Sequence, residues 1–304
     1  MSESTAKLLG NSPAFVRLLH TLRLVAMTDA GVLINGERGV GKTLLAQELH
    51  ASSQRRMLPF TAINCAGMPD SAFAVRFSTV DGALRGVGGS DLHHGGTLFL
   101  DEVGELSAQS QSILFHFLEN SAASRELRLI SASSKDLIAQ IGNGTFREDL
   151  FYRLFVVPLD LPPLRERADD LVLLLKHFSR EIALAYKRPA PRYSVGARNL
   201  LKAYSWPGNI RELRNLCERM VILLAGRMIQ PENLPEEIRS GAGGDKASLR
   251  FALPAEGIDL LKLEGDMIRQ ALGMTGGNRS KAARLLRLTR DTLLYRIQKH
   301  NIEM

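Results

Sequence analysis

The stretch Gly36-Glu-Arg-Gly-Val-Gly-Lys-Thr43 decides how the rest of this 304-residue chain is interpreted. It follows an apolar run and precedes a segment with helical spacing, which predicts a glycine-rich turn between a strand and a helix. The backbone N–H groups of such a turn approach phosphates closely, and the helix N-terminus favours an anion. We therefore expect a nucleotide-phosphate site built from Gly36, Gly39, Gly41, Lys42 and Thr43, in which Lys42 reaches the β- and γ-phosphates and the Thr43 hydroxyl ligates Mg²⁺. The alternative, an ordinary strand–helix turn, is disfavoured because motif and context agree.

A second apolar run, residues 97–100, ends in the acidic pair Asp101-Glu102. A carboxylate at that strand end can hold the hydration shell of Mg²⁺ opposite the glycine-rich turn, and we assign this role to Asp101. Glu102 is then placed to orient the attacking water. By itself an acidic pair is more often a solvated loop pair. Together with the phosphate motif it predicts a site that binds ATP and hydrolyses it.

Length and composition exclude several classes of protein. At roughly 150 residues per domain, 304 residues predict about two domains with a hydrophobic core. The content of 45% hydrophobic and 23% charged residues is typical of folded rather than disordered chains. Cys65 and Cys217 lie far apart, so we expect two buried thiols and neither a disulfide framework nor a zinc site. Because there is no signal pattern and no apolar run of the roughly 18 residues that a bilayer requires, we expect a cytoplasmic protein without a membrane partner.

Short apolar runs alternate with helical patterns over residues 8–240, as in a parallel sheet covered by helices. The expected strands are residues 31–35, 97–100, 127–132 and 156–159. Helical spacing continues in residues 169–186, 195–204 and 210–224, and small, flexible residues follow near position 240. The predicted organisation is an α/β nucleotide-binding subdomain at 1–165, a helical lid subdomain at 166–240, a linker at 241–257 and a small all-α domain at 258–304.

Much of the positive charge lies in the last segment. The whole chain has 39 Lys and Arg against 32 Asp and Glu, a net charge of +7. Residues 260–304 alone hold nine basic and four acidic residues, a surplus of five. Such a unit can neutralise DNA phosphates. The alternative is a solvated helical face used for dimer contacts.

Three helices are expected in this segment. The first has an apolar stripe, the second spans residues 279–286, and Thr289 caps the third after a tight turn. The stripe consists of Leu260, Leu261, Leu263, Met267, Ile268 and Leu272, and the inward side chains of the third helix are Leu293, Leu294 and Ile297. This helix-turn-helix spacing favours double-stranded DNA as partner. Candidate base and phosphate contacts at the exposed start of the third helix are Arg290, Asp291, Thr292, Tyr295 and Arg296.

Four further motifs carry a family resemblance: Ile63-Asn-Cys-Ala66, Phe146-Arg-Glu-Asp-Leu-Phe-Tyr-Arg-Leu154, Leu161-Pro-Pro-Leu-Arg-Glu-Arg167 and Trp206-Pro-Gly-Asn-Ile-Arg-Glu-Leu213. With the two nucleotide motifs, nearly the whole chain resembles the bacterial enhancer-binding proteins, the nitrogen-regulatory-protein-C class of sigma-54-dependent transcription activators. The resemblance implies an AAA+ P-loop domain with a helical lid that uses ATP and Mg²⁺. Residues 276–286 likewise resemble a Fis-type DNA-binding domain, which implies dimers and a two-fold-related DNA site.

The resemblance also implies roles for individual residues. The family's enzyme is a ring, usually a hexamer, with nucleotide sites between subunits, so Arg147 and Arg153 match arginine fingers that complete the neighbour's site. Surface ion pairing with Glu148 or Asp149 is the alternative for these arginines. Arg211 matches the sensor arginine of the lid, and Asn64 matches the residue that couples the catalytic glutamate to nucleotide state.

Three departures from the family pattern concern its output and its chemistry. The family contacts sigma-54 through Gly-Ala-Phe-Thr-Gly-Ala, where this chain has Gly82-Ala-Leu-Arg-Gly-Val87, with Leu84 and Arg85 as the altered contact residues. A second family insertion is reduced to residues 121–126. Ser133-Ser134 replaces the usual Thr-Asn of the first sensor and loses the amide that aligns water, which leaves the efficiency of hydrolysis open.

The sequence thus predicts a sequence-specific transcription regulator with an ATP-hydrolysing core that acts on RNA polymerase holoenzyme, although the altered hexapeptide puts the sigma-54 contact in question. One alternative is an accessory subunit that assembles with a complete relative; another is a sigma-54-independent regulator that uses ATP to set its oligomeric state or DNA occupancy. About ten residues precede the ATPase domain, so we expect control by a regulatory protein partner, by nucleotide or by expression.

Overall fold

The computed structural model describes residues 8–77, 79–80, 83–84, 96–120, 126–240, 259–286, 288–300 and 302. The chain divides into two compact units, Met1–Gly244 and Asp245–Met304. Among the described residues, no helix combines the length and the apolar character needed to cross a lipid bilayer.

Five parallel strands form the central sheet of the first unit. Their order is β2 (Phe60–Asn64), β5 (Thr97–Asp101), β6 (Arg128–Ser133), β1 (Val32–Asn35) and β7 (Val157–Asp160). The register pairs Asn64 with Asp101 and Asn35 with Ser133. Because parallel strands end at the same edge, this edge gathers the chemistry-bearing strand ends and the loop that follows β1.

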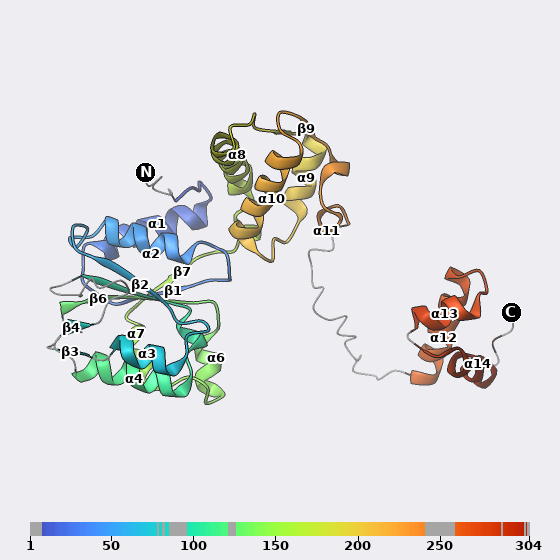
Figure 1. The fold of residues 1–304 in the computed structure, drawn as a ribbon, viewed down its shortest axis with the longest axis horizontal. Coiled ribbons are helices and arrows are strands. Elements are labelled where there is room, and N and C mark those ends of the chain that lie inside the picture. Colours follow the sequence, from blue (N-terminus) through green and yellow to red (C-terminus); the bar gives the residue numbers. More distant parts are fainter. Residues whose placement is uncertain are drawn as a thin grey trace. The chain divides into compact units, whose positions relative to one another are not determined.

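Helices cover both faces of the sheet (Figure 1). Side chains of β1 alternate between the faces. Val32 and Ile34 pack into the core beneath α1 (Pro13–Ala26) and α2 (Lys42–Ala51). Leu33 joins the opposite core, to which four helices contribute: α3 (Asp70–Phe77), α4 (Ala108–Asn120), α6 (Leu137–Gly142) and α7 (Glu148–Leu154). Burial on both faces explains why these strands read as continuous apolar runs.

The lid has a separate core around Trp206, which is 1% exposed and donates its indole N–H to the Leu201 carbonyl at 2.8 Å. The 3-10 turn η2 (Leu164–Arg167) leads from the sheet into the lid. The other lid elements are α8 (Ala168–Ala185), β8 (Arg192–Tyr193), α9 (Val195–Ala203), α10 (Asn209–Leu223), β9 (Met228–Ile229), η3 (Pro231–Asn233) and α11 (Glu236–Arg239). An apolar face on each long helix builds this core.

Three helices form the second unit: α12 (Leu260–Met274), α13 (Arg279–Leu285) and α14 (Arg290–Lys299). A side-chain cap starts each of them. Asp259 accepts from the backbone N–H groups of Leu261 and Lys262, Asn278 accepts from that of Lys281, and Thr289 accepts from that of Thr292. The cap predicted at Thr289 is therefore confirmed. Ile268, Leu272, Leu293 and Ile297 are buried in the core, as expected.

The prediction of a buried apolar stripe on α12 is wrong for two of its residues. Leu261 and Met267 are 56% and 44% exposed, because α13 and α14 cover only the side of α12 that carries Ile268 and Leu272. Leu294 is half-buried. The side chains of Leu260 and Leu263 lie outside the described residues.

The four expected strands and the three expected lid helices are confirmed, with ends that differ by at most one residue. The list of apolar runs missed β2, an edge strand in which Ile63 alone is buried, so its sequence alternates weakly. Cys65 and Cys217 are both free and buried, as predicted.

The altered hexapeptide is described only in part. Backbone pairing joins β3 (Thr79–Val80) to β4 (Ala83–Leu84) antiparallel, with Leu84 opposite Thr79. Arg85, the shortened segment at 121–125 and the linker at 241–257 lie outside the described residues.

Candidate nucleotide site and DNA-binding surface

The glycine-rich loop connects β1 to α2 and fixes Lys42 at the first position of that helix. Gly41 caps the helix with φ 106°, a left-handed conformation that favours glycine. The Lys42 side chain is 5% exposed, and its ammonium donates to the carbonyls of Gly36 at 2.9 Å and Glu37 at 3.3 Å. Carbonyl contacts hold the cation inside the curve of the loop, where it faces any phosphate bound there.

The loop is also bound to the lid. Arg165 forms two hydrogen bonds with the Glu37 carboxylate, at 2.6 and 2.9 Å, and these bonds lower the pKa of Glu37. Asn209 donates to the same carboxylate and to the Arg38 carbonyl. A Cβ on Gly39 would lie 2.3 Å from the Gly208 carbonyl oxygen, so only glycine fits where loop and lid touch. The position of the lid is thus coupled to the conformation of the phosphate loop.

Asp101 fits the role of a cation-holding carboxylate. Its Oδ2 accepts from the Thr43 hydroxyl at 3.0 Å, and its Oδ1 is buried without a hydrogen-bond partner. Burial, with the nearby Glu102 carboxylate, raises the pKa of Asp101. An unpartnered buried carboxylate oxygen beside a hydroxyl is the oxygen-rich donor set that Mg²⁺ prefers.

Both oxygens of Glu102 are engaged. Oε1 lies 2.9 Å from the Lys42 ammonium, and Oε2 accepts from the Ser134 backbone N–H at 2.9 Å and from the Ser134 hydroxyl at 2.6 Å. Burial acts to raise the pKa of Glu102, but the Ser134 and Lys42 contacts outweigh it and hold the pKa below its usual value. The residue has φ 57°, which turns the chain sharply after β5. Ser134, which the sequence had marked only as a departure from the family, therefore positions this carboxylate.

A pocket of about 560 Å³ brings most of the predicted nucleotide-site residues together, although Gly36 lines a neighbouring pocket instead. The first of these pockets is lined by Gly39, Gly41, Lys42, Thr43, Asn64, Asp101, Glu102 and Arg211 among others. Phe15, Leu174 and Phe178 form apolar walls at its other end. The volume of the pocket is in the range of small-molecule binding sites. The Asn64 amide oxygen accepts from the Ala66 backbone N–H at 2.9 Å. Arg211 reaches the pocket from α10 of the lid.

Arg147 and Arg153 are not among the residues that line this pocket. Arg147 pairs with Asp149 at 2.7 Å, hydrogen-bonds the Ser112 hydroxyl at 3.0 Å and stacks over the Phe115 ring. Arg153, at the other end of α7, lies 3.6 Å from the Glu119 carboxylate. The structure thus separates these two arginines from the nucleotide pocket of their own chain.

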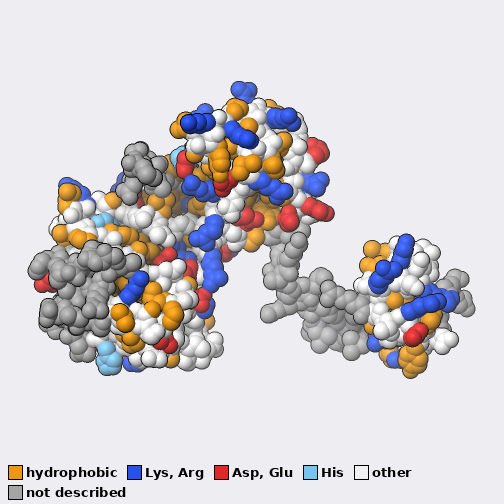
Figure 2. All heavy atoms as spheres, viewed as in Figure 1, with side chains coloured by type: hydrophobic (Ala, Val, Ile, Leu, Met, Phe, Trp, Pro, Cys, Tyr) orange, Lys and Arg blue, Asp and Glu red, His pale blue; other side chains and the backbone are white. Residues whose placement is uncertain are grey.

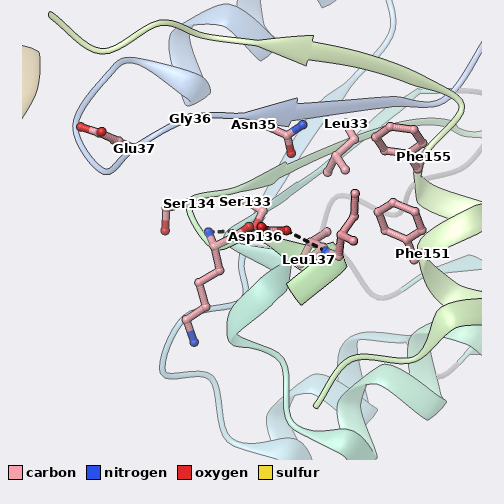
Figure 3. A pocket seen from close by; sticks show the side chains of 12 residues that line it. Leu33, Asn35, Gly36, Glu37, Ser133, Ser134, Asp136, Leu137, Phe151 and Phe155 are labelled. Carbon is pink, nitrogen blue, oxygen red and sulfur yellow. Dashed lines mark hydrogen bonds between the residues drawn. The ribbon is translucent and has the colours of Figure 1, made fainter. Parts of the chain in front are cut away.

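A smaller pocket of about 340 Å³ lies behind the sensor segment. Figure 3 draws Phe151 and Phe155 of the α7 region on one side of it and residues 133–136 on the other. Their rings stack at 4.8 Å, and Asp136 caps α6. This pocket connects the segment that holds Glu102 with the helix that carries Arg147 and Arg153.

Lys and Arg side chains lie on the viewed face of the second unit (Figure 2). Arg290 and Asp291 are exposed at the start of α14, Tyr295 is 67% exposed, and Thr292 is half-buried next to the Thr289 cap. Arg296 is not free, because Glu264 of α12 binds it through one carboxylate oxygen and binds His300 at 2.9 Å through the other. Four of the five predicted contact residues thus lack such an ion pair among the described residues.

The fold and the site define a P-loop nucleotide-binding protein of the AAA+ type, with a helical lid and a helix-turn-helix unit. Three family descriptions match the chain: the Sigma-54 interaction domain at residues 8–160, the AAA+ ATPase lid domain at residues 165–250, and Bacterial regulatory protein, Fis family, at residues 260–300. The chain belongs to the family of sigma-54-dependent transcription activators, and it is a transcriptional regulator with an AAA+ domain and a Fis-type DNA-binding domain.

Similar proteins agree over almost the whole chain. The transcriptional regulatory protein ZraR of Klebsiella oxytoca is 39% identical over 307 residues, which cover 96% of this chain and 68% of the relative. The regulatory protein AtoC of Escherichia coli K12 is 36% identical, covering 97% and 68%. The crystal structure of NtrX from Brucella abortus in complex with ATP has a TM-score of 0.71 and 32% identity, covering 98% and 70%. These matches do not favour the two alternatives, an accessory subunit and a sigma-54-independent regulator.

Proposed function

We propose that this regulator binds ATP and Mg²⁺ in the 560 Å³ pocket, hydrolyses ATP at the contacts between subunits of a ring, and uses the cycle to remodel RNA polymerase holoenzyme at promoters chosen by its Fis-type unit. The observation that carries the proposal is the convergence of Lys42, Thr43, Asp101, Glu102 and Arg211 on one pocket. Two cationic side chains, a hydroxyl and two carboxylates are what a triphosphate and its divalent cation require. The ATP in the related NtrX structure supports the same choice of nucleotide.

Each residue has a separate task in this proposal. Lys42 neutralises the β- and γ-phosphates, and Thr43 and Asp101 hold the cation, whose site is supported by the unpartnered Asp101 Oδ1. Mg²⁺ there supplies positive charge against the phosphate oxygens. Glu102 orients the water that attacks the γ-phosphorus, and Asn64 senses the nucleotide state. The glycines Gly36, Gly39 and Gly41 let the loop backbone approach the phosphates, and Arg211 brings the lid into contact with them.

A ring supplies the remaining charge. Arg147 and Arg153 lie away from their own pocket, with side chains 39% and 52% exposed, so a neighbouring subunit can receive them. A guanidinium at the γ-phosphate stabilises the transition state, and delivery by a neighbour makes hydrolysis depend on assembly. We infer a hexamer from the family resemblance. Arg147 first has to exchange its contact with Asp149 for phosphate.

The output of the ring is RNA polymerase with sigma-54, reached through residues 82–87. The Sigma-54 interaction domain match spans these residues, which supports a sigma-54 contact in spite of the changes at Leu84 and Arg85. Leu84 then supplies the apolar contact that an aromatic supplies in the family. A regulatory protein partner remains the proposed source of control.

At the other end of the chain, a dimer of the Fis-type unit recognises a two-fold-related site on double-stranded DNA. Arg290, Asp291, Thr292, Tyr295 and Arg296 supply its contacts, and Arg296 has to release Glu264 to do so. We propose domain boundaries at 1–165, 166–240, 241–257 and 258–304. Since promoter DNA is the target, the protein works in the cytoplasm.

The experiment that tests the proposal has two parts. ATP turnover is measured for the purified full chain and for Lys42→Ala; we expect turnover in the former and none in the latter. The protein is then mixed with sigma-54 and ADP–metal fluoride on a native gel, beside an activator with the complete hexapeptide. A trapped complex supports a sigma-54 target. Turnover without a trapped complex would reject sigma-54 as the target but not the ATPase activity. Absence of turnover would reject the ATPase activity itself.

A further inference from the structure

The tip of the phosphate loop carries a guanidinium that the assigned roles do not use. Arg38 lines the nucleotide pocket together with Lys42, Asp101 and Glu102. Its side chain is 67% exposed, and its Nη2 lies 2.5 Å from Oε1 of Glu105. The Arg38 backbone is held in place by Asn209, which donates to its carbonyl at 3.1 Å. The base of this side chain is therefore held in place, while most of the side chain is exposed.

Glu105 joins Arg38 and Lys135 in a short chain of ion pairs. It lies in η1 (Val103–Glu105), the turn that follows Glu102, and its N–H donates to the Glu102 carbonyl at 3.0 Å. Its second oxygen, Oε2, lies 2.6 Å from the ammonium of Lys135, which follows Ser134 in sequence. Arg38 therefore spans from the phosphate loop to the segment that carries the proposed water-orienting carboxylate.

The terminal phosphate of a bound triphosphate has to lie in the same gap. The loop backbone and Lys42 hold the phosphates from one side, and Asp101 and Glu102 face them from the other. Arg38 lines the same pocket and reaches from the loop to the turn that follows Glu102, so its guanidinium is within reach of the terminal phosphate, which a diphosphate lacks. Arg38 is thus placed to distinguish the two nucleotides.

We propose that Arg38 is a further catalytic residue, which leaves Glu105 when ATP binds and donates its N–H groups to the γ-phosphate of its own subunit. This inference rests on the proposed ATPase function and deepens it. Water adds to the γ-phosphorus as the bond to the β–γ bridging oxygen breaks, giving ADP and inorganic phosphate, and the proton that this water loses passes by way of Glu102 to the product phosphate or the solvent. Arg38 neither gains nor loses a proton, and it stabilises the charge that spreads over the γ-phosphate oxygens.

Glu105 is the resting partner of Arg38. An exposed ion pair contributes little stability, so a phosphate that carries more charge and accepts two parallel hydrogen bonds displaces it. Lys135 weakens the hold of Glu105 on Arg38, because it shares the same carboxylate. After γ-phosphate leaves, Arg38 returns to Glu105 and the site discriminates again between ATP and ADP.

The test compares binding of Mg²⁺ complexes of AMP-PNP and ADP to the full chain, by calorimetry. Arg38→Gln should raise the Kd for AMP-PNP about tenfold, the loss of one charge-assisted contact, and leave the Kd for ADP within about twofold. Arg38→Lys should restore part of the preference. Glu105→Gln should lower the Kd for AMP-PNP a few-fold, and this gain should vanish in the Arg38→Gln background. Lys135→Gln, which alters the same carboxylate from the far side, is the matched control and should not tighten AMP-PNP binding.

Turnover supplies the second readout. At saturating ATP, Arg38→Gln should lower kcat by about 100-fold or more, whereas Lys135→Gln should not. Equal losses for AMP-PNP and ADP, or an unchanged AMP-PNP to ADP ratio with unchanged kcat, would overturn the role of Arg38. If the unaltered chain bound neither nucleotide, both the proposed function and this inference would fall. If the unaltered chain bound and hydrolysed ATP, and the Arg38→Gln variant did so equally well, only the inference about Arg38 would be rejected.

Discussion

A single hydroxyl, that of Ser134, contacts the carboxylate that we propose orients the attacking water. Ser134 binds the Glu102 carboxylate through its backbone N–H and its hydroxyl, while Lys42 occupies the other oxygen. In the nucleotide-free chain the carboxylate is therefore fully engaged. Because we expect Lys42 to move towards phosphate, we expect nucleotide binding to free one carboxylate oxygen for water and to leave the other bound to Ser134.

Removing that hydroxyl should shift the pH dependence of hydrolysis. The Ser134 and Lys42 contacts hold the pKa of Glu102 below its usual value. A lowered carboxyl pKa keeps Glu102 ionised as the pH falls, so Ser134→Ala should raise the pKa and move the acid limb of the kcat/KM profile to higher pH. We also expect kcat to fall by about tenfold, since a misplaced base loses part of its contribution. Ser134→Thr retains the hydroxyl and should keep the original profile; an unshifted limb in Ser134→Ala would contradict this role.

The contact between the phosphate loop and the lid gives a second prediction at this scale. Gly39 has φ 80°, and an added Cβ would lie 2.3 Å from the Gly208 carbonyl oxygen. Gly39→Ala should therefore destabilise the first unit by about 1–3 kcal/mol and weaken nucleotide binding. Gly142→Ala, where a Cβ meets nothing within 4 Å, is the control. Chemical denaturation of both variants is the measurement, and equal midpoints would count against a steric requirement at Gly39.

At the scale of elements, the ends of strands and helices determine where the chemistry lies. β6 separates β1 from β5 in the sheet, yet the Thr43 hydroxyl at the start of α2 reaches Asp101 at the end of β5. The helix starts beyond the sheet edge, so it spans the intervening strand. In the second unit, the Thr289 cap fixes the start of α14, from which Arg290 and Asp291 project. An element boundary therefore sets the geometry of each proposed contact.

Loss of the α14 cap should affect both stability and DNA binding. Thr289 accepts from the Thr292 N–H at 3.2 Å. Thr289→Ala should cost about 0.5–2 kcal/mol of stability in the second unit, while Thr289→Ser should cost little. Thermal unfolding of the full chain, followed together with DNA affinity, is the measurement. A second unit that is as stable in Thr289→Ala as in the unaltered chain would exclude a stabilising cap.

At the scale of the whole molecule, the nucleotide pocket is lined by a lysine, a pair of carboxylates and a lid arginine of its own chain. Arg147 and Arg153 lie elsewhere. A complete site that includes them requires a second copy. If Arg147 and Arg153 act as the proposed fingers, turnover depends on ring assembly, and two defective subunits should complement each other.

Mixing two inactive variants should restore activity. Lys42→Ala lacks phosphate binding but keeps its fingers, and Arg147→Ala keeps the pocket but lacks one finger. In randomly mixed rings about a quarter of the contacts combine an intact pocket with an intact finger, so we expect up to about a quarter of full turnover. A mixture of Arg147→Ala with the double variant Lys42→Ala/Arg147→Ala, in place of Lys42→Ala, should stay inactive. No recovery in the first mixture would contradict delivery of Arg147 by a neighbour.

The fold and much of the site could be predicted from local sequence. Continuous apolar runs revealed four of the five sheet strands, because their burial on both faces removes polar residues; the edge strand β2 left only a weak signal. The phosphate loop and Asp101-Glu102 were found because each is contiguous and follows a strand. Helical spacing and the Thr289 cap likewise sufficed for the second unit, although Leu261 and Met267 proved exposed.

Local sequence determined which groups this protein has: a phosphate loop, an acidic strand end, a basic helix-turn-helix. The tertiary structure alone decided their partners. The contacts of Arg38 with Glu105, Glu102 with Ser134 and Glu37 with Arg165 join residues 67, 32 and 128 positions apart. No periodicity records such pairs, because they depend on how strand ends and loops converge at one edge of the sheet after the core has packed.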